Sequence, residues 1–140
     1  MAVALLDSTI GVFYADSRKF MFSLYAHKLP VTSIDISDDS ALLASVSSDK
    51  TVKIWGMDYG NCHKSLIAHE KAALVVRFVP ETHFFFTAGK DGIVKYWDGD
   101  AKSLILQLQG HCGDIWDMIV SSEGDFIMTT GSDLSLRIWA

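Results

Sequence analysis

The sequence lacks the features that mark membrane and secreted proteins. Its longest apolar runs, of which Met1 to Leu6 is one, fall far short of the ~20 residues that a membrane-spanning helix needs. No cationic region followed by a long apolar stretch marks a secretory signal. Only 2 cysteines occur in 140 residues, whereas a small secreted scaffold normally uses more. We therefore expect a soluble, intracellular protein with reduced thiols and no membrane contact.

Basic charge is also scarce. The 12 Lys and Arg residues are outnumbered by 17 Asp and Glu, which gives a net charge of -5 and a pI near 5.4. A protein with this balance has no broad basic surface to neutralise phosphates, so autonomous nucleic-acid binding is disfavoured. Apolar residues, in contrast, make up 49% of the chain, which excludes a disordered protein.

The dominant feature that is present is a repeat with an interval of 42 residues. Histidine, aspartate and tryptophan recur at this interval without a gap, and a hydroxyl residue stands four positions before each aspartate. The three sets are His27, Ser45, Asp49 and Trp55; His69, Thr87, Asp91 and Trp97; and His111, Thr129, Asp133 and Trp139. Upstream, Asp7 keeps the same register and Phe13 takes the Trp position. Such a fixed interval is the signature of a repeat architecture.

Each unit has the pattern of short strands separated by polar turns. Residues 32–36 alternate apolar and polar side chains, residues 41–46 form a near-continuous apolar run, and residues 51–55 alternate again. The same order returns in the later units, and no segment has a sustained helical stripe. We predict an all-β chain. Its units are 1–25 (a partial unit), 26–67, 68–109 and 110–140, the last truncated after its third strand.

Four short strands in about 42 residues, with a Gly-His or Ala-His pair before the first and a Trp closing the third, resemble the WD40 repeat family. The residues that carry the resemblance are Ala26-His27, Ala68-His69 and Gly110-His111, with Ile54-Trp55, Tyr96-Trp97 and Ile138-Trp139. Only Trp97-Asp98 is a true Trp-Asp pair. The resemblance implies a β-propeller of four-stranded antiparallel blades, of which this chain would be an arc of about 3.3 blades. We expect the chain to be part of a larger propeller, because a lone arc leaves two apolar blade faces open.

The recurring His, hydroxyl and Asp residues are also the components of a hydrolase triad. A hydrolase needs one such set beside an oxyanion site, whereas this chain carries the set three times. In WD40 proteins the matching residues form a buried network. The resemblance therefore implies structural tetrads, in which each His bridges the hydroxyl and the Asp while the Trp indole N–H donates to the hydroxyl. We expect no enzyme; a hydrolase that uses one Ser-His-Asp set is the alternative, and it would turn over a generic ester.

Metal and cofactor sites are not indicated. Cys62-His63 with His69, or His111-Cys112, offer ligand types, but no paired cysteine spacing completes a site. Gly89 to Gly92 is a strand turn that is too short for a phosphate-binding loop. We expect no cofactor and no metal.

Partner contacts in the WD40 family fall before the first strand, at its second residue, and just before the turn aspartate. At these positions we expect a contact cluster of Trp116, Leu74 and Lys90. An exposed Trp is a common binding hot spot. Trp116 also shares its strand phase with Met118 and Val120, so a packed Trp116 is the alternative.

Three segments are distinctive beyond the generic repeat: residues 23–31, 49–65 and 76–97. They resemble the C-terminal propeller of the WD repeat-containing protein three family, large nucleolar proteins of the UtpB module. That module assembles with the U3 small nucleolar ribonucleoprotein in the small-subunit processome. The resemblance implies a non-catalytic scaffold for protein assembly in 18S ribosomal RNA maturation, located in the nucleus and nucleolus.

The same resemblance implies UtpB and U3 snoRNP subunits as partners, with RNA contact indirect or through other parts of the parent chain. A different WD40 adaptor, such as a ubiquitin-ligase substrate receptor or a signalling scaffold, is the alternative function.

Overall fold

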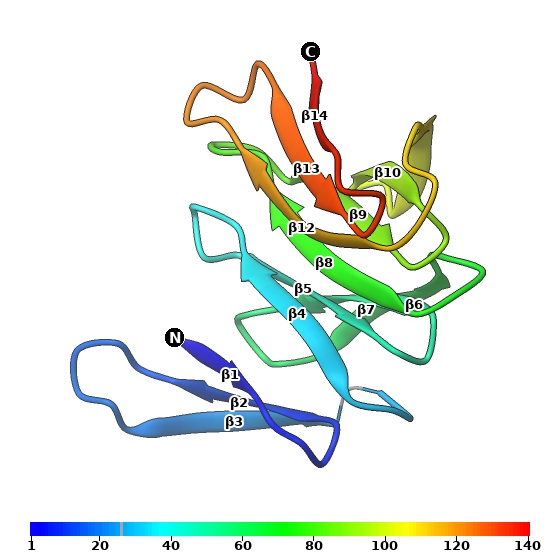
Figure 1. The fold of residues 1–140 in the computed structure, drawn as a ribbon. Helices are drawn as coiled ribbons and strands as arrows, with labels where there is room; N and C mark the ends of the chain where they lie inside the picture. The colour runs from blue at the N-terminus through cyan, green and yellow to red at the C-terminus, as the bar shows by residue number, and fades with distance from the viewer. Residues whose placement is uncertain (26) are drawn as a thin grey trace.

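The computed structural model describes residues 1–25 and 27–140. Ala26, which opens the predicted unit 26–67 and belongs to the Ala26-His27 pair, lies outside the described residues. The described residues form strands joined into four antiparallel sheets (Figure 1). No helix among them is long and apolar enough to cross a membrane. The prediction of an all-β arc of propeller blades is confirmed.

In every sheet the spatial order of the strands follows the chain. The first sheet holds β1 (Ala2–Ala4), β2 (Thr9–Phe13) and β3 (Phe20–Tyr25). The second holds β4 (Val31–Ile36), β5 (Leu42–Ser47), β6 (Thr51–Gly56) and β7 (Cys62–Ile67). The third holds β8 (Ala73–Phe78), β9 (Phe84–Gly89), β10 (Ile93–Asp98) and β11 (Ser103–Gln109). The fourth holds β12 (Ile115–Val120), β13 (Ile127–Gly131) and β14 (Leu136–Trp139).

The apolar core lies between the sheets, which follow one another as blades do. The first strands of the last three sheets, β4, β8 and β12, run side by side and appear in cyan, green and orange (Figure 1). Because neighbouring sheets cover both faces of β5, all of its residues are buried. Its Leu43 packs toward the first sheet with Trp55, while Ala44 and Val46 pack toward the third. The apolar run predicted over residues 41–46 is thus a doubly covered strand.

A β-bulge interrupts each of these first strands at its second residue. The pairing register shifts between Val31 and Ser33, between Ala73 and Val75, and between Ile115 and Asp117. A bulge leaves the extra residue out of the ladder and re-aims its side chain. The three displaced residues are Thr32, Leu74 and Trp116, so two of the three predicted contact residues lie in bulges.

Candidate functional site

The third sheet brings His69, Thr87, Asp91 and Trp97 into one hydrogen-bonded network. His69 precedes β8, Thr87 lies on β9, Asp91 occupies the β9–β10 turn, and Trp97 lies on β10. His69 Nδ1 is 2.9 Å from Asp91 Oδ2, and His69 Nε2 is 2.9 Å from Thr87 Oγ1. The Trp97 indole N–H donates to the same Thr87 oxygen over 2.9 Å. Two strands, the turn between them and the segment before β8 therefore each bring side chains into one buried site.

The chemistry of the partners fixes where the protons lie. The ionised carboxylate of Asp91 only accepts hydrogen bonds, so His69 donates to it from Nδ1–H. The neutral ring then carries a lone pair on Nε2, which accepts the Thr87 hydroxyl proton. Thr87 in turn accepts the indole N–H of Trp97. In this network of four side chains, each of these hydrogen bonds has one donor and one acceptor when the His69 imidazole is neutral and in its Nδ1–H form.

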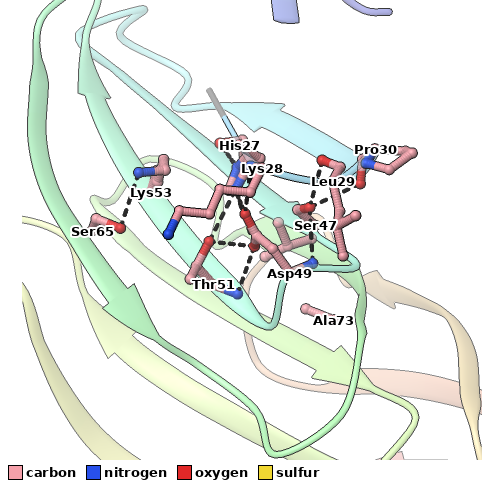
Figure 2. Close-up of polar contacts among 12 residues, drawn as sticks. His27, Lys28, Leu29, Pro30, Ser47, Asp49, Thr51, Lys53, Ser65 and Ala73 are labelled. Atoms are coloured by element: carbon pink, nitrogen blue, oxygen red, sulfur yellow. Dashed lines mark hydrogen bonds and ion pairs between the residues drawn. The ribbon is translucent and has the colours of Figure 1, made fainter. Parts of the chain in front are cut away.

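The second and fourth sheets contain the same arrangement. His27 Nδ1 lies 3.1 Å from Asp49 Oδ2, and Nε2 lies 2.8 Å from Ser45 Oγ; Figure 2 shows His27 above Asp49. Trp55 donates to Ser45 over 3.0 Å. The fourth sheet repeats these contacts among His111, Thr129, Asp133 and Trp139, at distances of 3.0, 2.7 and 3.0 Å. In each set the segment before the first strand is tied to the turn that carries the aspartate.

Sequence reasoning missed a fifth residue in two of the networks. The Thr51 hydroxyl donates to Asp49 over 2.5 Å and lies 2.9 Å from His27 Nδ1 (Figure 2). The Ser135 hydroxyl donates to Asp133 over 2.6 Å. The signal was available, because a hydroxyl residue stands two positions after Asp7, Asp49 and Asp133 but not after Asp91, where Ile93 takes the place.

Burial and hydrogen bonding set the ionisation of the networks. Burial lowers the pKa of His27 more than the Asp49 carboxylate raises it. Burial acts to raise the pKa of Asp49, but the hydrogen bonds from the Thr51 side chain and backbone and from the Lys28 amide outweigh it, so this pKa is lowered. The hydrogen bond from Ser135 is the main cause of the lowered pKa of Asp133. The site of the second sheet thus favours a neutral His27 imidazole against an ionised Asp49 carboxylate.

This arrangement suits a structural link better than a nucleophile. The hydroxyl of each set accepts an indole N–H while it donates to an imidazole, and it lies in the buried part of its sheet. In the described part of the chain, no three His, Cys, Asp or Glu side chains gather as a metal site requires. Cys62 and Cys112 are exposed thiols.

The predicted contact residues lie at one end of the sheets. Trp116 is 59% exposed although Met118, two residues on, is buried, because the bulge removes Trp116 from the alternation of β12. The packed alternative for Trp116 is therefore wrong. Leu74 occupies the equivalent bulge of β8 and is half-buried. Lys90 is exposed in the β9–β10 turn, where its backbone N–H donates to the Ala72 carbonyl over 2.9 Å. Leu74 and Lys90 thus share one end of the third sheet, while Trp116 lies on the neighbouring strand.

Successive antiparallel sheets of three or four strands, three of them held by the same His, Ser or Thr, Asp and Trp network, define the chain as an arc of a WD40 β-propeller. The solved structure of U3-55K matches 99% of this chain and 44% of its own length, with a TM-score of 0.90 and 22% identity, which shows the shared fold. The chain belongs to the family described as the WDR3 second beta-propeller domain, whose sequence model matches residues 1–140.

Curated relatives include WD40-type proteins of different names. Nuclear distribution protein PAC1 of Arthroderma benhamiae is 28% identical over 151 residues, which cover 99% of this chain and 32% of the relative. Nuclear distribution protein nudF 1 of Talaromyces marneffei is 32% identical over 122 residues, which cover 84% of this chain and 26% of the relative. The chain thus spans about a third or less of the length of these relatives.

Proposed function

We propose that this chain is a non-catalytic WD40 scaffold in the small-subunit processome, where the U3 snoRNP acts in 18S ribosomal RNA maturation. The observation that carries the proposal is the match of residues 1–140 to the WDR3 second propeller family. The name of the structural neighbour U3-55K points in the same direction. On this proposal the protein works in the nucleus and nucleolus.

The three tetrads act as structural links in this proposal, and they hold the loops in place for binding. Their buried hydroxyls are engaged by two partners each, so they position loops instead of attacking substrates. The division of the chain into units 1–25, 26–67, 68–109 and 110–140 belongs to the same proposal. Each later unit would then contribute one His-bearing loop and one Asp-bearing turn to the binding end.

The proposed partners are proteins of the UtpB module and the U3 snoRNP. A net charge of -5 favours protein partners over direct contact with RNA phosphates. Trp116, Leu74 and Lys90 are the proposed contact cluster, with Trp116 as its anchor because a large aromatic side chain that is 59% exposed can bury much area on binding.

The first experiment tags the endogenous protein that contains this chain, purifies it gently and measures U3 RNA in the eluate. Strong enrichment of U3 RNA supports the proposal. If U3 RNA is absent under conditions in which a known processome subunit retains it, the protein is instead a WD40 adaptor of another pathway.

A pair of variants tests the contact cluster separately. Trp116→Ala should lower the recovery of U3 RNA, whereas Tyr59→Ala should not. Tyr59 is a matched control because it is an exposed aromatic residue, 89% accessible. It lies in the turn between β6 and β7, at the end of the second sheet that is opposite to the proposed contact cluster. Equal recovery from both variants would contradict the contact cluster and leave the processome proposal standing.

A further inference from the structure

His83 connects two neighbouring sheets at the end opposite to the tetrads. It lies in the turn between β8 and β9, and its side chain is 27% exposed. Its Nε2 is 2.7 Å from Asp39 Oδ2, in the β4–β5 turn of the preceding sheet. Its Nδ1 is 2.8 Å from Asp100 Oδ1, in the β10–β11 turn of its own sheet. One imidazole ring therefore spans the boundary between the second and third sheets.

The two short contacts require a particular protonation state. An ionised carboxylate only accepts hydrogen bonds, and a neutral imidazole has a single N–H to donate. Only the imidazolium form of His83 can donate to Asp39 and Asp100 together. In a neutral ring, one nitrogen lone pair would face a carboxylate oxygen at under 3 Å, and that contact would be repulsive.

The surroundings of His83 favour the positive charge. His83 lines a surface cavity of about 540 Å³ whose other charged lining residues are all acidic: Asp38, Asp39, Glu81 and Asp100. Asp39 contacts the ring from the β4–β5 turn and Asp100 from the β10–β11 turn, while Asp38 and Glu81 line the same cavity from the β4–β5 turn and the β8–β9 turn. Hydrogen bonds to Asp100 and then to Asp39 raise the pKa of His83 above its ordinary value.

The Asp39 carboxylate and the backbone of Asp100 are held by contacts that do not involve the imidazole ring. The Ser37 hydroxyl and the Ala41 amide donate to Oδ1 of Asp39, which leaves Oδ2 for His83 and, with the His83 contact, lowers the pKa of Asp39 to about 2. The Asp98 carboxylate accepts the backbone N–H of Asp100 over 2.9 Å. The Gly99 amide donates to the His83 carbonyl over 3.0 Å. The three turns are thus positioned independently of the imidazole.

This cluster does not recur along the repeat. One interval of 42 residues further on, Asp125 stands at the position of His83 and Glu81 at that of Asp39. Two acidic residues cannot form the same bridge, so this contact is not repeated between the third and fourth sheets. We propose that His83 is a pH-sensitive clamp between the β4–β7 and β8–β11 sheets, closed when its ring is an imidazolium and weakened when the ring loses a proton.

The direct test is an NMR titration of the imidazole nitrogens in the chain between pH 5 and pH 9. The expected midpoint for His83 lies above the ordinary value of 6.5, with both ring nitrogens protonated below it. Asp39→Asn should move this midpoint down by about 1 pH unit, because it removes one facing charge. A midpoint at or below 6.5 in the unsubstituted chain would overturn the clamp, and that measurement needs no variant.

Thermal unfolding at two pH values tests whether the clamp contributes to the joint between the sheets. Since the pKa of His83 is raised on folding, its contribution is complete below pH 6.5 and is lost as the pH rises through the folded midpoint. His83→Gln should therefore lower the Tm more at pH 5.5 than at pH 8.5. The exposed His63 on β7 provides the matched control, and His63→Gln should show no such difference. An equal loss of Tm at both pH values for His83→Gln would overturn the proposal.

Discussion

Replacing Thr87 by Val tests the central link of the best-buried tetrad. Valine has nearly the same shape as threonine, so the change removes a hydroxyl without opening a cavity. Two groups lose their partners, His69 Nε2 and Trp97 Nε1. Thr87, His69 and Trp97 are 0%, 1% and 4% exposed, so water cannot replace the hydroxyl. An orphaned buried polar group costs about 1–3 kcal/mol, so the free energy of unfolding should fall by about 2–6 kcal/mol.

Urea unfolding, followed by tryptophan fluorescence, measures this loss against two controls. Thr87→Ser keeps the hydroxyl and removes one methyl group, so it should cost about 0.5–1.5 kcal/mol. Thr129→Val removes the equivalent hydroxyl beside Trp139, which is half-buried, and should cost less than Thr87→Val because water reaches the indole. If Thr87→Val and Thr87→Ser lose the same stability, the hydroxyl is not the link and the reasoning fails.

Four further outcomes are expected. Asp91→Ala should lower the Tm, since it leaves His69 Nδ1–H without its acceptor, and an unchanged Tm in a thermal melt would contradict the network. Gly89→Ala should also lower the Tm, because a Cβ there would lie 2.6 Å from the Ala72 carbonyl oxygen. A Tm equal to that of the unsubstituted chain would show that the backbone shifts to make room for the Cβ without loss of stability. Trp116→Ala should change the unfolding free energy by less than about 0.5 kcal/mol, and a larger change in urea unfolding would mean that Trp116 supports the fold. Burial lowers the pKa of His27, so the stability that the neutral His27 ring contributes is present above pH 6.5 and declines as the pH falls. NMR should find the His27 ring neutral at pH 6.5, and a protonated ring at that pH would refute the lowered pKa.

The strands were predictable to different degrees. The segments 32–36, 41–46 and 51–55 are predictable from apolar runs and alternation, and they correspond to β4, β5 and β6. Residues 1–25 were recognised only as a partial unit, although they form β1, β2 and β3. Their Asp7 kept the repeat register, but a unit without its histidine and hydroxyl offers too few landmarks to place strands.

The position of Trp116 could not be read from alternation. Strict period-two phase puts Trp116 on the side of the buried Met118, yet a bulge shifts the register between them. A bulge adds one residue without a marked change in composition, so only the paired backbone reveals which side chain turns to solvent.

The sequence by itself determined the architecture, because the interval of 42 residues repeats the same strand pattern and the same His, hydroxyl, Asp and Trp positions. Residues one interval apart occupy equivalent places, so a linear pattern is enough to find them. The bridge from Asp39 through His83 to Asp100 follows no such interval. It depends on how far one sheet is rotated against the next, and that angle is set by the side chains packed between the sheets. Only the tertiary structure therefore decided which turns meet across a boundary between sheets.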